Sequence, residues 1–527
     1  MLSPKEPFYI TTPIYYINDN PHIGTAYCTI AADILARHER LQGKDVFFLT
    51  GTDEHGEKIQ EAALKSGKSL QEFTDEVSEK FKIAWKKLGI SNDDFIRTTE
   101  ARHKNAVLHY LKVAIESGDV YLGNYEGSYC VSDETFWTEG QLIENKCPTC
   151  KRDVKKIKEE NYFFKISKYT PLLLKHIEEN PHFILPVAKK NEVVAFLKEG
   201  VRDISISRTS FTWGIPFPES DATKEKHVMY VWFDALLNYV TALDPLNKKD
   251  KFNRYWGSSN EPRAIHLVGK DILRFHAVYW PCFLMSVGLP LPKRIFAHGW
   301  WTIEGQKMSK SLGNAIDPVQ FAEQFGNDAL RLFLFREFPF GQDGDFSLKN
   351  FKERSNADLA NNLGNLVSRT LNLIQKNLNG VIKVPTLEPD QDFKTTAFDA
   401  LQMPAVKLRG LEMERFNYHE ILHSIFTALI SLNKYIDTKA PWALAKDPAR
   451  KTELESVLYN VAEGIRLSAL YLWPFIPSTA EEILRRLGQK PMTDFFSGES
   501  TFDKAVKWGA GQEATIDVGP SLFARIT

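Results

Sequence analysis

The sequence predicts an α/β fold: a parallel sheet with covering helices, an inserted module of short strands, and an all-helical C-terminal part. Three observations predict it. Strand-like and helix-like segments alternate from Phe8 to Ile90, as they do in proteins with parallel sheets. Short strands, aromatic residues and a cysteine cluster replace this alternation between Gly118 and Lys226. From about Leu348 onward, apolar residues recur at helical spacing almost without interruption.

The first strand is expected at "FYITTPIYY", residues 8–16, where aromatic and β-branched residues dominate. A helix follows at about residues 23–42, and "DVFFL" is a second, buried strand. Further helices are expected at residues 56–67 and 69–90. Strands that alternate with helices run parallel through right-handed crossovers, and ligands bind beyond their carboxyl ends. Residues 50–56 therefore lie where a ligand site is expected.

The domain boundaries follow from these changes in pattern. After the inserted module, "MYVWFDALLNYV" and "RAIHLVGKDILRFHAVYWP" return to the buried strand-to-helix style. A hairpin-like segment then leads into the loop "GQKMSKSLGN". The expected divisions are residues 1–117 and 227–300 for the two halves of the sheet domain, 118–226 for the inserted module, 301–350 for the loop region and 351–527 for the helical domain.

Composition limits the class of protein. The chain has 527 residues, of which 43% are hydrophobic and 25% charged, as in ordinary soluble globular proteins. No stretch approaches the ~18 consecutive apolar residues of a membrane span. The N-terminal segment lacks the features of signal and transit peptides, so a cytoplasmic location is expected. The net charge of −1 argues against nucleic-acid binding over the whole surface but allows a local basic face.

The segment "PHIGTAY", residues 21–27, stands where the first strand gives way to a helix. Pro21 suits the first helical position, and the free N–H groups of a helix start favour a phosphate. Gly24 lets a ligand approach the backbone, and His22 can donate to a phosphate oxygen. No GxGxxG or GxxxxGK[ST] motif is present. A bound nucleotide would therefore need another kind of phosphate site, such as this helix start. On this segment alone, a structural histidine remains the stronger interpretation.

The segment "GQKMSKSLGN", residues 305–314, is more specific. Lys307 and Lys310 lie three residues apart among small residues, which favour a mobile loop. Two ammonium groups on such a loop can clamp a polyphosphate whose charge rises in the transition state. The alternative is an exposed surface turn, and the apolar Met308 between the lysines argues mildly against it.

Five segments together resemble the methionyl-tRNA synthetases, a family of class I aminoacyl-tRNA synthetases: "TPIYYINDNPHIGTAY", "FFLTGTDEHGEKIQ", "VWFDALLNY", "GKDILRFHAVYWP" and "KMSKSLGN". The match covers most of the chain, in order. The resemblance implies a Rossmann-like catalytic domain with an inserted connective module and an all-α anticodon-binding bundle. It also implies ATP-dependent ligation of L-methionine to tRNA(Met), through methionyl-adenylate and with release of pyrophosphate.

The resemblance implies an ATP site that works with Mg²⁺ and a catalytic group of His22, Lys307 and Lys310. The residues expected to bind ATP are His22, Gly24, Thr25, Gly269, Asp271, Lys307 and Lys310. Thr25 stands where many class I enzymes have a second histidine, and its hydroxyl can bond a phosphate but carries no charge. For Asp271, a helix N-cap is the alternative interpretation.

The resemblance also implies a methionine pocket, in which Asp53 accepts the amino group. The remaining pocket positions are Ile14, Tyr16, Trp232, Ala235, Leu236, Tyr239, Ile272, Phe275, His276 and Tyr279. Tyr16 and His276 are expected to contact the sulfur, through a hydroxyl and a ring N–H. Core packing is the alternative for Phe275 and Tyr279.

For the tRNA, the resemblance implies that Asn365, Arg369 and Trp442 read the CAU anticodon. Asn and Arg can bond the edges of splayed bases, and Trp offers a stacking face. Asn365 and Arg369 share one helix face by their spacing. The appended tRNA-binding and dimerising domain of some relatives is not found, so a monomer is expected.

The cysteine cluster departs from the family pattern of two C-x-x-C-like pairs, because Asp133 replaces one cysteine. The remaining candidates, Cys130, Cys147 and Cys150, keep a spacing that suits tetrahedral zinc, and a carboxylate is an acceptable fourth ligand. The alternative is a decayed knuckle held together by packing.

Three other classes of protein fit the sequence less well than a methionyl-tRNA synthetase. The class I synthetases for isoleucine, valine and leucine have a large editing insertion, for which residues 118–226 are too short. A non-catalytic RNA-binding relative would have lost Asp53 or the signature lysines, and all are present. A small-molecule nucleotidyltransferase would not need the helical domain.

Overall fold

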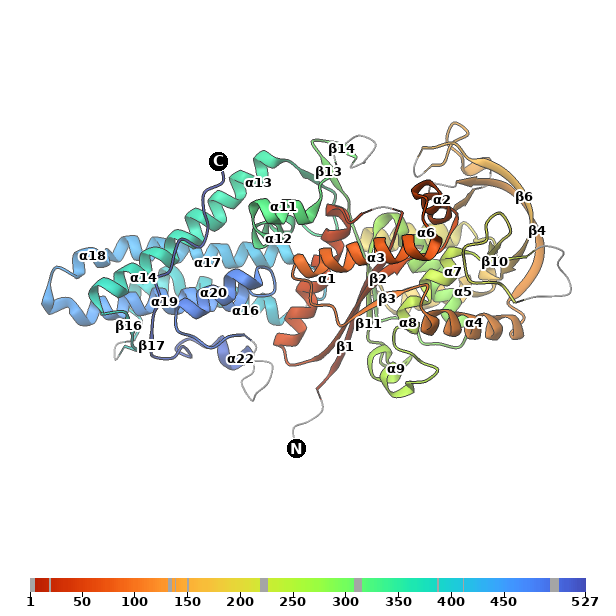
Figure 1. Ribbon diagram of the computed structural model, residues 1–527. Coiled ribbons are helices and arrows are strands. Elements are labelled where there is room, and N and C mark those ends of the chain that lie inside the picture. The colour runs from red at the N-terminus through yellow and green to blue at the C-terminus, as the bar shows by residue number, and fades with distance from the viewer. Residues whose placement is uncertain are drawn as a thin grey trace.

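In the computed structural model, a parallel sheet lies between an antiparallel module and a bundle of helices (Figure 1). The structure describes residues 5–18, 20–130, 135–137, 139–148, 151–218, 226–307, 315–385, 388–410, 412–492 and 502–527. Over these ranges, no helix has the length and apolar character needed to cross a membrane.

Six parallel strands form the central sheet in the order β3-β2-β1-β11-β12-β7. Their bounds are Pro7–Tyr16 (β1), Asp45–Asp53 (β2), Asp94–Arg97 (β3), Ile184–Leu185 (β7), Ala264–Gly269 (β11) and Arg294–His298 (β12). The central strands are buried almost throughout, which explains their nearly continuous apolar sequences. The predicted parallel sheet is confirmed.

Helices connect the first strands and cover the sheet. They are α1 (Ile23–Leu41), α2 (Glu57–Ser66), α3 (Leu70–Lys87) and α4 (Ala101–Glu116). α1 is buried along nearly its whole length because it packs on β1, β2 and β11 on one side and on the helical domain on the other. α3 begins with a capping box between Ser69 and Glu72, which satisfies the first N–H groups of the helix.

The inserted module is a curved antiparallel sheet in the order β5-β4-β6-β8 (Figure 1). Its elements are β4 (Val120–Cys130), β5 (Thr135–Trp137), η1 (Glu139–Gln141), β6 (Lys155–Phe164), α5 (Ile166–Glu179), α6 (Val187–Lys198) and β8 (Ile204–Ser205), followed by the pair β9 (Ser207–Arg208) and β10 (Val228–Met229). The sequence places residues 118–226 outside the catalytic sheet, whereas β7 within this range pairs with β12. The chain therefore returns to the central sheet once inside the predicted insertion.

The chain then completes the central sheet and forms a small mixed sheet, β14-β13-β15. The elements are α7 (Val231–Leu236), α8 (Asn238–Thr241), α9 (Lys249–Trp256), η2 (Lys270–Ile272), η3 (Phe275–Tyr279), α10 (Trp280–Ser286), β13 (Trp301–Ile303), β14 (Gln306–Lys307), α11 (Pro318–Phe325), α12 (Asn327–Arg336) and β15 (Gly344–Phe346). The predicted hairpin before the lysine loop is the antiparallel pair of β13 and β14.

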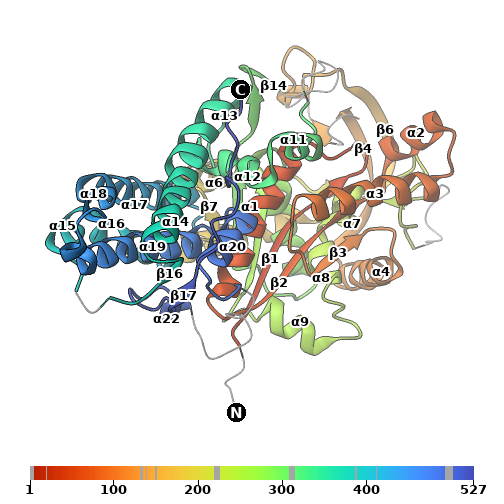
Figure 2. The same ribbon diagram turned by 60° about the vertical axis from the view of Figure 1, so that its left-hand side comes forward.

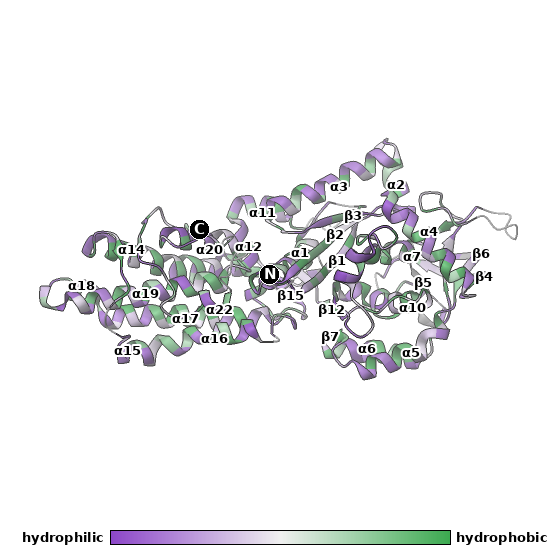
Figure 3. Ribbon diagram, turned by 90° about the horizontal axis from the view of Figure 1, so that it is seen from below, coloured by the Kyte–Doolittle hydropathy of each residue, from purple (hydrophilic) through white to green (hydrophobic). Residues whose placement is uncertain are grey.

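The C-terminal part is helical, as predicted, apart from a short strand pair, β16 (Val381–Ile382) with β17 (Ala514–Thr515). Its helices are α13 (Leu348–Arg354), η5 (Ser355–Gly364), α14 (Asn365–Asn377), α15 (Gln391–Phe393), η6 (Lys394–Phe398), α16 (Asp399–Arg409), α17 (Tyr418–Lys439), α18 (Pro441–Leu444), η7 (Pro448–Arg450), α19 (Lys451–Leu472), α20 (Pro477–Arg486) and α22 (Phe502–Ala505). Apolar and polar residues alternate along most of these ribbons, as in amphipathic helices (Figure 3).

The helical domain joins the sheet domain through α12, which lies close to α1 and the bundle (Figure 2). The fully buried guanidinium of Arg331 on α12 donates to Asp33 Oδ2 on α1 at 2.7 Å. It also donates to the carbonyls of Phe475 at 2.8 Å and Pro474 at 3.1 Å, in the turn before α20. Beside this joint, the Tyr418 hydroxyl of α17 donates to a carbonyl of α1 at 2.7 Å. Buried polar contacts therefore fix α1 to the helical domain.

Candidate active site

The carboxyl ends of β1, β2, β11 and β12 form one edge of the central sheet. Because these strands run parallel, the side chains of their last residues meet there. Tyr16 on β1 pairs with Asp53 on β2, and Gly269 on β11 pairs with His298 on β12. α1 begins after β1, with His22 directly before its first residue. Residues from "PHIG", "TDEHG" and "GKD" thus lie along one edge.

His22 is the N-cap of α1, and its ring bonds the first turn of the helix. The backbone N–H of Gly24 donates to His22 Nδ1 at 3.1 Å. A backbone N–H only donates, so Nδ1 carries no proton and the proton of the neutral ring lies on Nε2. Burial lowers the pKa of His22 against the opposing charge of Asp271, which favours the neutral ring at pH 7. The cap therefore uses only Nδ1 of the ring, and the Nε2–H is the group that can donate to a ligand.

The helix start predicted at about residue 23 is confirmed, because α1 begins at Ile23 and His22 takes the capping position. Pro21 therefore lies before the helix, and Thr25 makes contacts other than the one expected. The Thr25 hydroxyl, expected to bond a phosphate, accepts from the His22 N–H at 3.1 Å and donates to the His22 carbonyl at 2.8 Å. Thr25 therefore closes a capping box. A Cβ at Gly24 would lie 3.0 Å from His22 Cε1, so a larger residue would displace the ring.

The "GKD" segment turns directly after β11 into η2. A Cβ at Gly269 would lie 2.4 Å from Asp271 Oδ1, so a larger residue here would displace the Asp271 carboxylate. Asp271 Oδ1 also accepts from Trp300 Nε1 at 3.1 Å. The alternative that Asp271 caps a helix does not hold, because Gly269 occupies the capping position of η2.

His298 and Trp300, which none of the predicted sites includes, also lie at this edge. His298 ends β12 and donates from Nδ1 to the next carbonyl at 2.8 Å. The backbone N–H of Trp300 donates to Asp343 Oδ1 at 2.8 Å, while its ring bonds Asp271. Their position in the sequence is a usable signal, because "HGWW" follows the strand beside β11, and side chains after such strands reach the same edge.

The lysine loop is anchored at both ends. At one end, Thr302 on β13 pairs with Lys307 on β14. The Lys307 side chain and the whole of Lys310 lie outside the described residues, so their predicted roles stay predictions. At the other end, the Ile316 carbonyl accepts from the N–H of Ile23 at 3.1 Å. The described segment after the loop therefore meets the first residue of α1, next to the cap.

Asp53 is the last residue of β2 and is only 7% exposed. Its backbone carbonyl accepts from the N–H of Ile17 at 3.2 Å, which ties the ends of β1 and β2 together. Tyr16 is its register partner on β1. A buried carboxylate at such an edge suits a ligand with an ammonium group.

Aromatic side chains from α7 and η3 pack together. Trp232 stacks on Phe275 with ring centroids 3.6 Å apart and planes 6° from parallel. The ring of His276 lies edge-on to Trp232 at 6.4 Å, and Tyr279 lies edge-on to Phe275 at 5.3 Å. The other predicted pocket residues from these and neighbouring elements are apolar and buried or partly buried: Ile14, Ala235, Leu236, Tyr239 and Ile272.

His276 forms hydrogen bonds through both ring nitrogens. Its Nδ1 lies 2.9 Å from the Ile272 carbonyl, and its Nε2 lies 2.7 Å from the Tyr239 hydroxyl. A carbonyl only accepts, so Nδ1 holds the proton and Nε2 accepts from the tyrosine. Burial lowers the pKa of His276 to about 4, so the ring is neutral at pH 7. The expectation that a ring N–H of His276 contacts sulfur is corrected, because that N–H is given to Ile272.

The predicted anticodon residues lie on α14 and α18 of the helical domain, and α18 lies at the end of that domain away from the sheet (Figure 1). Trp442 on α18 is 45% exposed. Arg369 on α14 donates to Asp437 Oδ1 at 2.6 Å and to Asn433 Oδ1 at 3.4 Å, both on α17. Asn365, one helical turn before Arg369, is exposed. Amide, cationic and aromatic side chains thus lie on these two helices.

Cys130 and Cys147 lie with Trp137 in a small buried cluster of the inserted module. The other two predicted metal ligands, Asp133 and Cys150, lie outside the described residues. Among the residues that the structure does describe, no group of three or more His, Cys, Asp or Glu could hold a metal ion. The two described cysteines belong to one buried cluster, and their sulfurs are of the donor type that zinc prefers.

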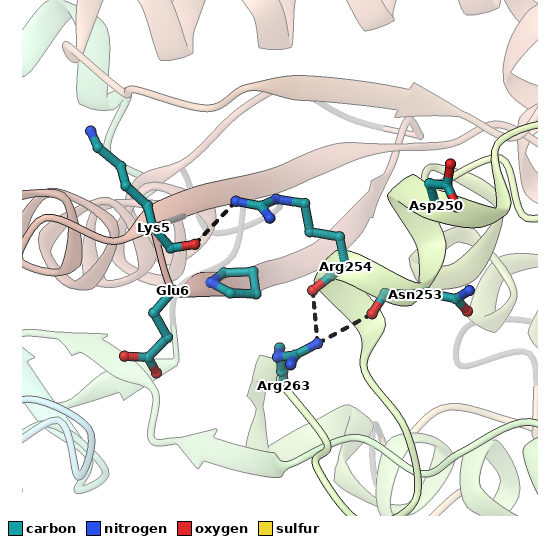
Figure 4. Close-up of a pocket in the computed structure, with 7 residues that line it drawn as sticks. Lys5, Glu6, Asp250, Asn253, Arg254 and Arg263 are labelled. Atoms are coloured by element: carbon teal, nitrogen blue, oxygen red, sulfur yellow. Dashed lines mark hydrogen bonds between the residues drawn. The ribbon is translucent and has the colours of Figure 1, made fainter. Parts of the chain in front are cut away.

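A hollow of about 420 Å³ lies at the opposite, amino-terminal edge of the sheet (Figure 4). The start of β1 and residues of α9 line it, together with Arg263. Its two guanidinium groups are engaged with backbone: Arg254 donates to Lys5 at 3.1 Å, and Arg263 donates to Asn253 at 3.2 Å. Ligands of parallel sheets bind at the other edge, so this hollow is not part of the candidate site.

A parallel sheet whose carboxyl edge combines a capped helix start, a lysine loop and a buried carboxylate defines an α/β enzyme that acts on a nucleotide. The family described as "tRNA synthetases class I (M)" matches residues 8–157 and 152–371. The methionine–tRNA ligase of Fusobacterium nucleatum is 46% identical over 526 residues, 99% of this chain and 80% of the relative. That of Thermotoga maritima is 45% identical over 524 residues, 98% of this chain and 80% of the relative.

Solved structures agree with these relatives. Mycobacterium tuberculosis methionyl-tRNA synthetase in complex with methionyl-adenylate matches with a TM-score of 0.91 at 42% identity, over 99% of this chain and 100% of that chain. Its apo form matches with a TM-score of 0.85 at 38% identity, over 100% and 99%. The chain belongs to the methionyl-tRNA synthetase family of class I synthetases. Its reaction is the ATP-dependent ligation of methionine to tRNA.

Proposed function

We propose that ATP and methionine meet at the carboxyl edge of the sheet, with α1 facing the phosphates and β2 facing the amino group. His22 Nε2–H donates to a phosphate oxygen, and Gly24 leaves room for the adenine. Gly269 and Asp271 contact the ribose. The observation that supports this best is the parallel register, because Asp53 ends β2 and α1 starts beyond the carboxyl end of the adjacent strand β1.

The first step joins the methionine carboxylate to the α-phosphate of ATP, and pyrophosphate leaves. The terminal ribose hydroxyl of the tRNA then attacks the acyl carbon, and AMP leaves. Negative charge grows on the phosphate oxygens in the first step, where His22, Lys307 and Lys310 stabilise it. Mg²⁺ on the phosphates would supply further positive charge. The side chains otherwise orient two reactants, which removes much of the entropic barrier.

Asp53→Asn tests the methionine site. The KM for methionine should rise about 10-fold to 100-fold, because a hydrogen bond to a charged group contributes about 1.5–3 kcal/mol. The KM for ATP should stay unchanged. ATP–pyrophosphate exchange measures both KM values. The same assay on the wild-type protein, run with each of the twenty amino acids in turn, should show exchange with methionine. Asp45→Asn, at the start of the same strand, is the control; a wild-type KM for methionine in Asp53→Asn would refute the role.

Asn365, Arg369 and Trp442 are proposed to bind the anticodon of tRNA(Met). Trp442→Ala should lower kcat/KM for tRNA about 10-fold to 100-fold, since stacking of one base contributes about 1–3 kcal/mol. Exchange without tRNA should not change, because α18 lies far from the sheet (Figure 1). Met403→Ala, which removes another exposed apolar side chain of the same domain, is the control. Equal losses in charging and exchange would argue against an anticodon role.

Cys130, Asp133, Cys147 and Cys150 are proposed to hold zinc in the inserted module. The chemistry of three thiolates and a carboxylate suits a tetrahedral site, and the buried pair Cys130 and Cys147 supports it. Metal analysis of the purified protein should give about one zinc ion per chain. Cys130→Ser should lose the metal, while Cys282→Ser, in the buried α10, should keep it. If the wild-type protein contains no zinc and Cys130→Ser is harmless, the zinc site is refuted. The cysteine cluster is then held together by packing.

The chain is further proposed to act in the cytoplasm as a monomer. The methionine–tRNA ligases that it resembles serve translation.

A further inference from the structure

A carboxylate that none of the proposed sites includes, Asp234, is held between two histidines. Its side chain on α7 is fully buried. His55 Nδ1 lies 2.6 Å from Asp234 Oδ2, and His103 Nε2 lies 2.7 Å from Oδ1. An ionised carboxylate only accepts, so each ring donates to one of its oxygens. The two histidines come from the loop after β2 and from α4, and both are buried.

The network continues from His103 back to α7. His103 Nδ1 lies 2.7 Å from the Thr241 hydroxyl, which donates to the Asn238 carbonyl at 3.3 Å. The Asn238 amide donates in turn to the Ala235 carbonyl at 2.6 Å. Polar contacts therefore run from α4 through α8 to Ala235, the residue beside Asp234 on α7.

The charge of Asp234 makes these contacts strong. Burial alone would raise the pKa of Asp234, but His55 and His103 outweigh it and hold the pKa at about 2. The carboxylate is therefore ionised at neutral pH, and hydrogen bonds to an ionised group in a buried setting are stronger than neutral ones. Removal of one histidine leaves a buried charge without one of its donors, which is costly.

The other end of the network fixes the loop between β2 and α2. The ring of His55 packs edge-on against Trp213 at 5.7 Å. Trp213 Nε1 donates to the Glu54 carbonyl at 2.5 Å, and the Gly56 N–H donates to the Trp213 carbonyl at 3.1 Å. Glu54 is the only residue between His55 and Asp53, so movement of the loop would move the Asp53 carboxylate.

We propose that the His55–Asp234–His103 network is a positioning unit that sets the affinity for methionine, by holding the loop that carries Asp53 against the helix that carries Trp232. The proposal rests on the proposed methionine site. None of the three network residues contacts the substrate in it. They act through Asp53 and through α7, which the network joins from two separate elements.

His103→Leu removes one donor of Asp234, and the KM for methionine in pyrophosphate exchange should rise about 10-fold or more, since small misplacements cost this much. The KM for ATP should change less than twofold, because the hydrogen bonds of the network among the described residues join His55, His103, Asp234 and Thr241, none of which belongs to α1 or η2. His103→Gln keeps an N–H near the position of Nε2 and should restore most of the methionine affinity. A purely structural role would lower the thermal midpoint without this split between the two substrates.

His38→Leu, a buried histidine at the other end of α1, is the matched control for loss of a core imidazole and should leave both KM values unchanged. If His103→Leu does not fold, Asp234→Asn and His103→Gln are compared by equilibrium binding of methionine. The inference would be overturned if Asp53→Asn raises the KM for methionine but folded His103→Leu keeps that KM within twofold of wild type. If Asp53→Asn also has no effect, the methionine site itself is wrong.

Discussion

Lys310→Ala is expected to slow methionyl-adenylate formation about 100-fold to 1,000-fold, the cost of removing one preorganised charge from a transition state. The anchors of its loop support the prediction. The described chain before the loop ends at the β13–β14 pair, and the chain after it bonds the first residue of α1 through Ile316. Because the described chain after the loop meets the start of α1, we expect Lys310 to act on the phosphates that are proposed to bind at His22. The charge it meets grows during the reaction, so the effect should fall on kcat.

The measurement is single-turnover formation of methionyl-adenylate, together with equilibrium binding of methionine. Methionine affinity should be nearly unchanged, because Asp53 lies at the end of a different element. Lys383→Ala, an exposed lysine of the helical domain, is the control for loss of a positive charge. An adenylation rate within threefold of wild type would exclude Lys310 from the chemistry.

Arg331→Met is expected to lower the free energy of unfolding by about 3–5 kcal/mol, the usual cost of removing one partner from a buried ion pair. Burial alone would raise the pKa of Asp33, but Arg37 and Arg331 outweigh it and hold that pKa below its ordinary value. Without Arg331, this buried charge keeps Arg37 and loses its second cation. The carbonyls of Phe475 and Pro474 lose their donors at the same time.

Urea unfolding followed by circular dichroism measures the loss. Arg485→Met is the matched control, because Arg485 also faces two carboxylates, Glu482 and Asp517, but lies exposed on α20. Exposed pairs contribute about 0–1 kcal/mol, so this variant should unfold close to wild type. Equal stability losses in the two variants would show that the buried joint is no stronger than a surface pair.

The strands that build the site were predictable because each is long and apolar. β1, β2 and β11 are buried almost throughout, and such strands read as aromatic and β-branched runs. The start of α1 at residue 23 was predictable, since His22 and Thr25 form a local cap. β7 was missed because two residues are too few to show any periodicity, and its partner β12 lies far along the chain.

Contacts between distant segments were out of reach of the sequence. His55 and Asp234 lie 179 residues apart in the sequence. Each belongs to a motif, "TDEHG" or "VWFDALLNY", in which other residues were the predicted site residues. The direction of the hydrogen bonds at His276 depends on the Ile272 carbonyl and the Tyr239 hydroxyl, and no pattern of residue types reveals it. The resemblance to a known family gave the candidate residues. The positions of their protons follow from the hydrogen-bond partners, which only the three-dimensional structure shows.

Helix α1 belongs to the joint with the helical domain, and its first turn is the proposed phosphate site, so the helix links the two mechanically. Asp33 is held by the helical domain, and Ile23 stands next to His22. The segment between them rises about 15 Å. A tilt of about 4° at the joint would therefore move the start of the helix by about 1 Å, a displacement that can cost about 100-fold in rate. If phosphates bind at the start of α1 as proposed, a small tilt of the helix at the helical domain would displace the groups that hold them.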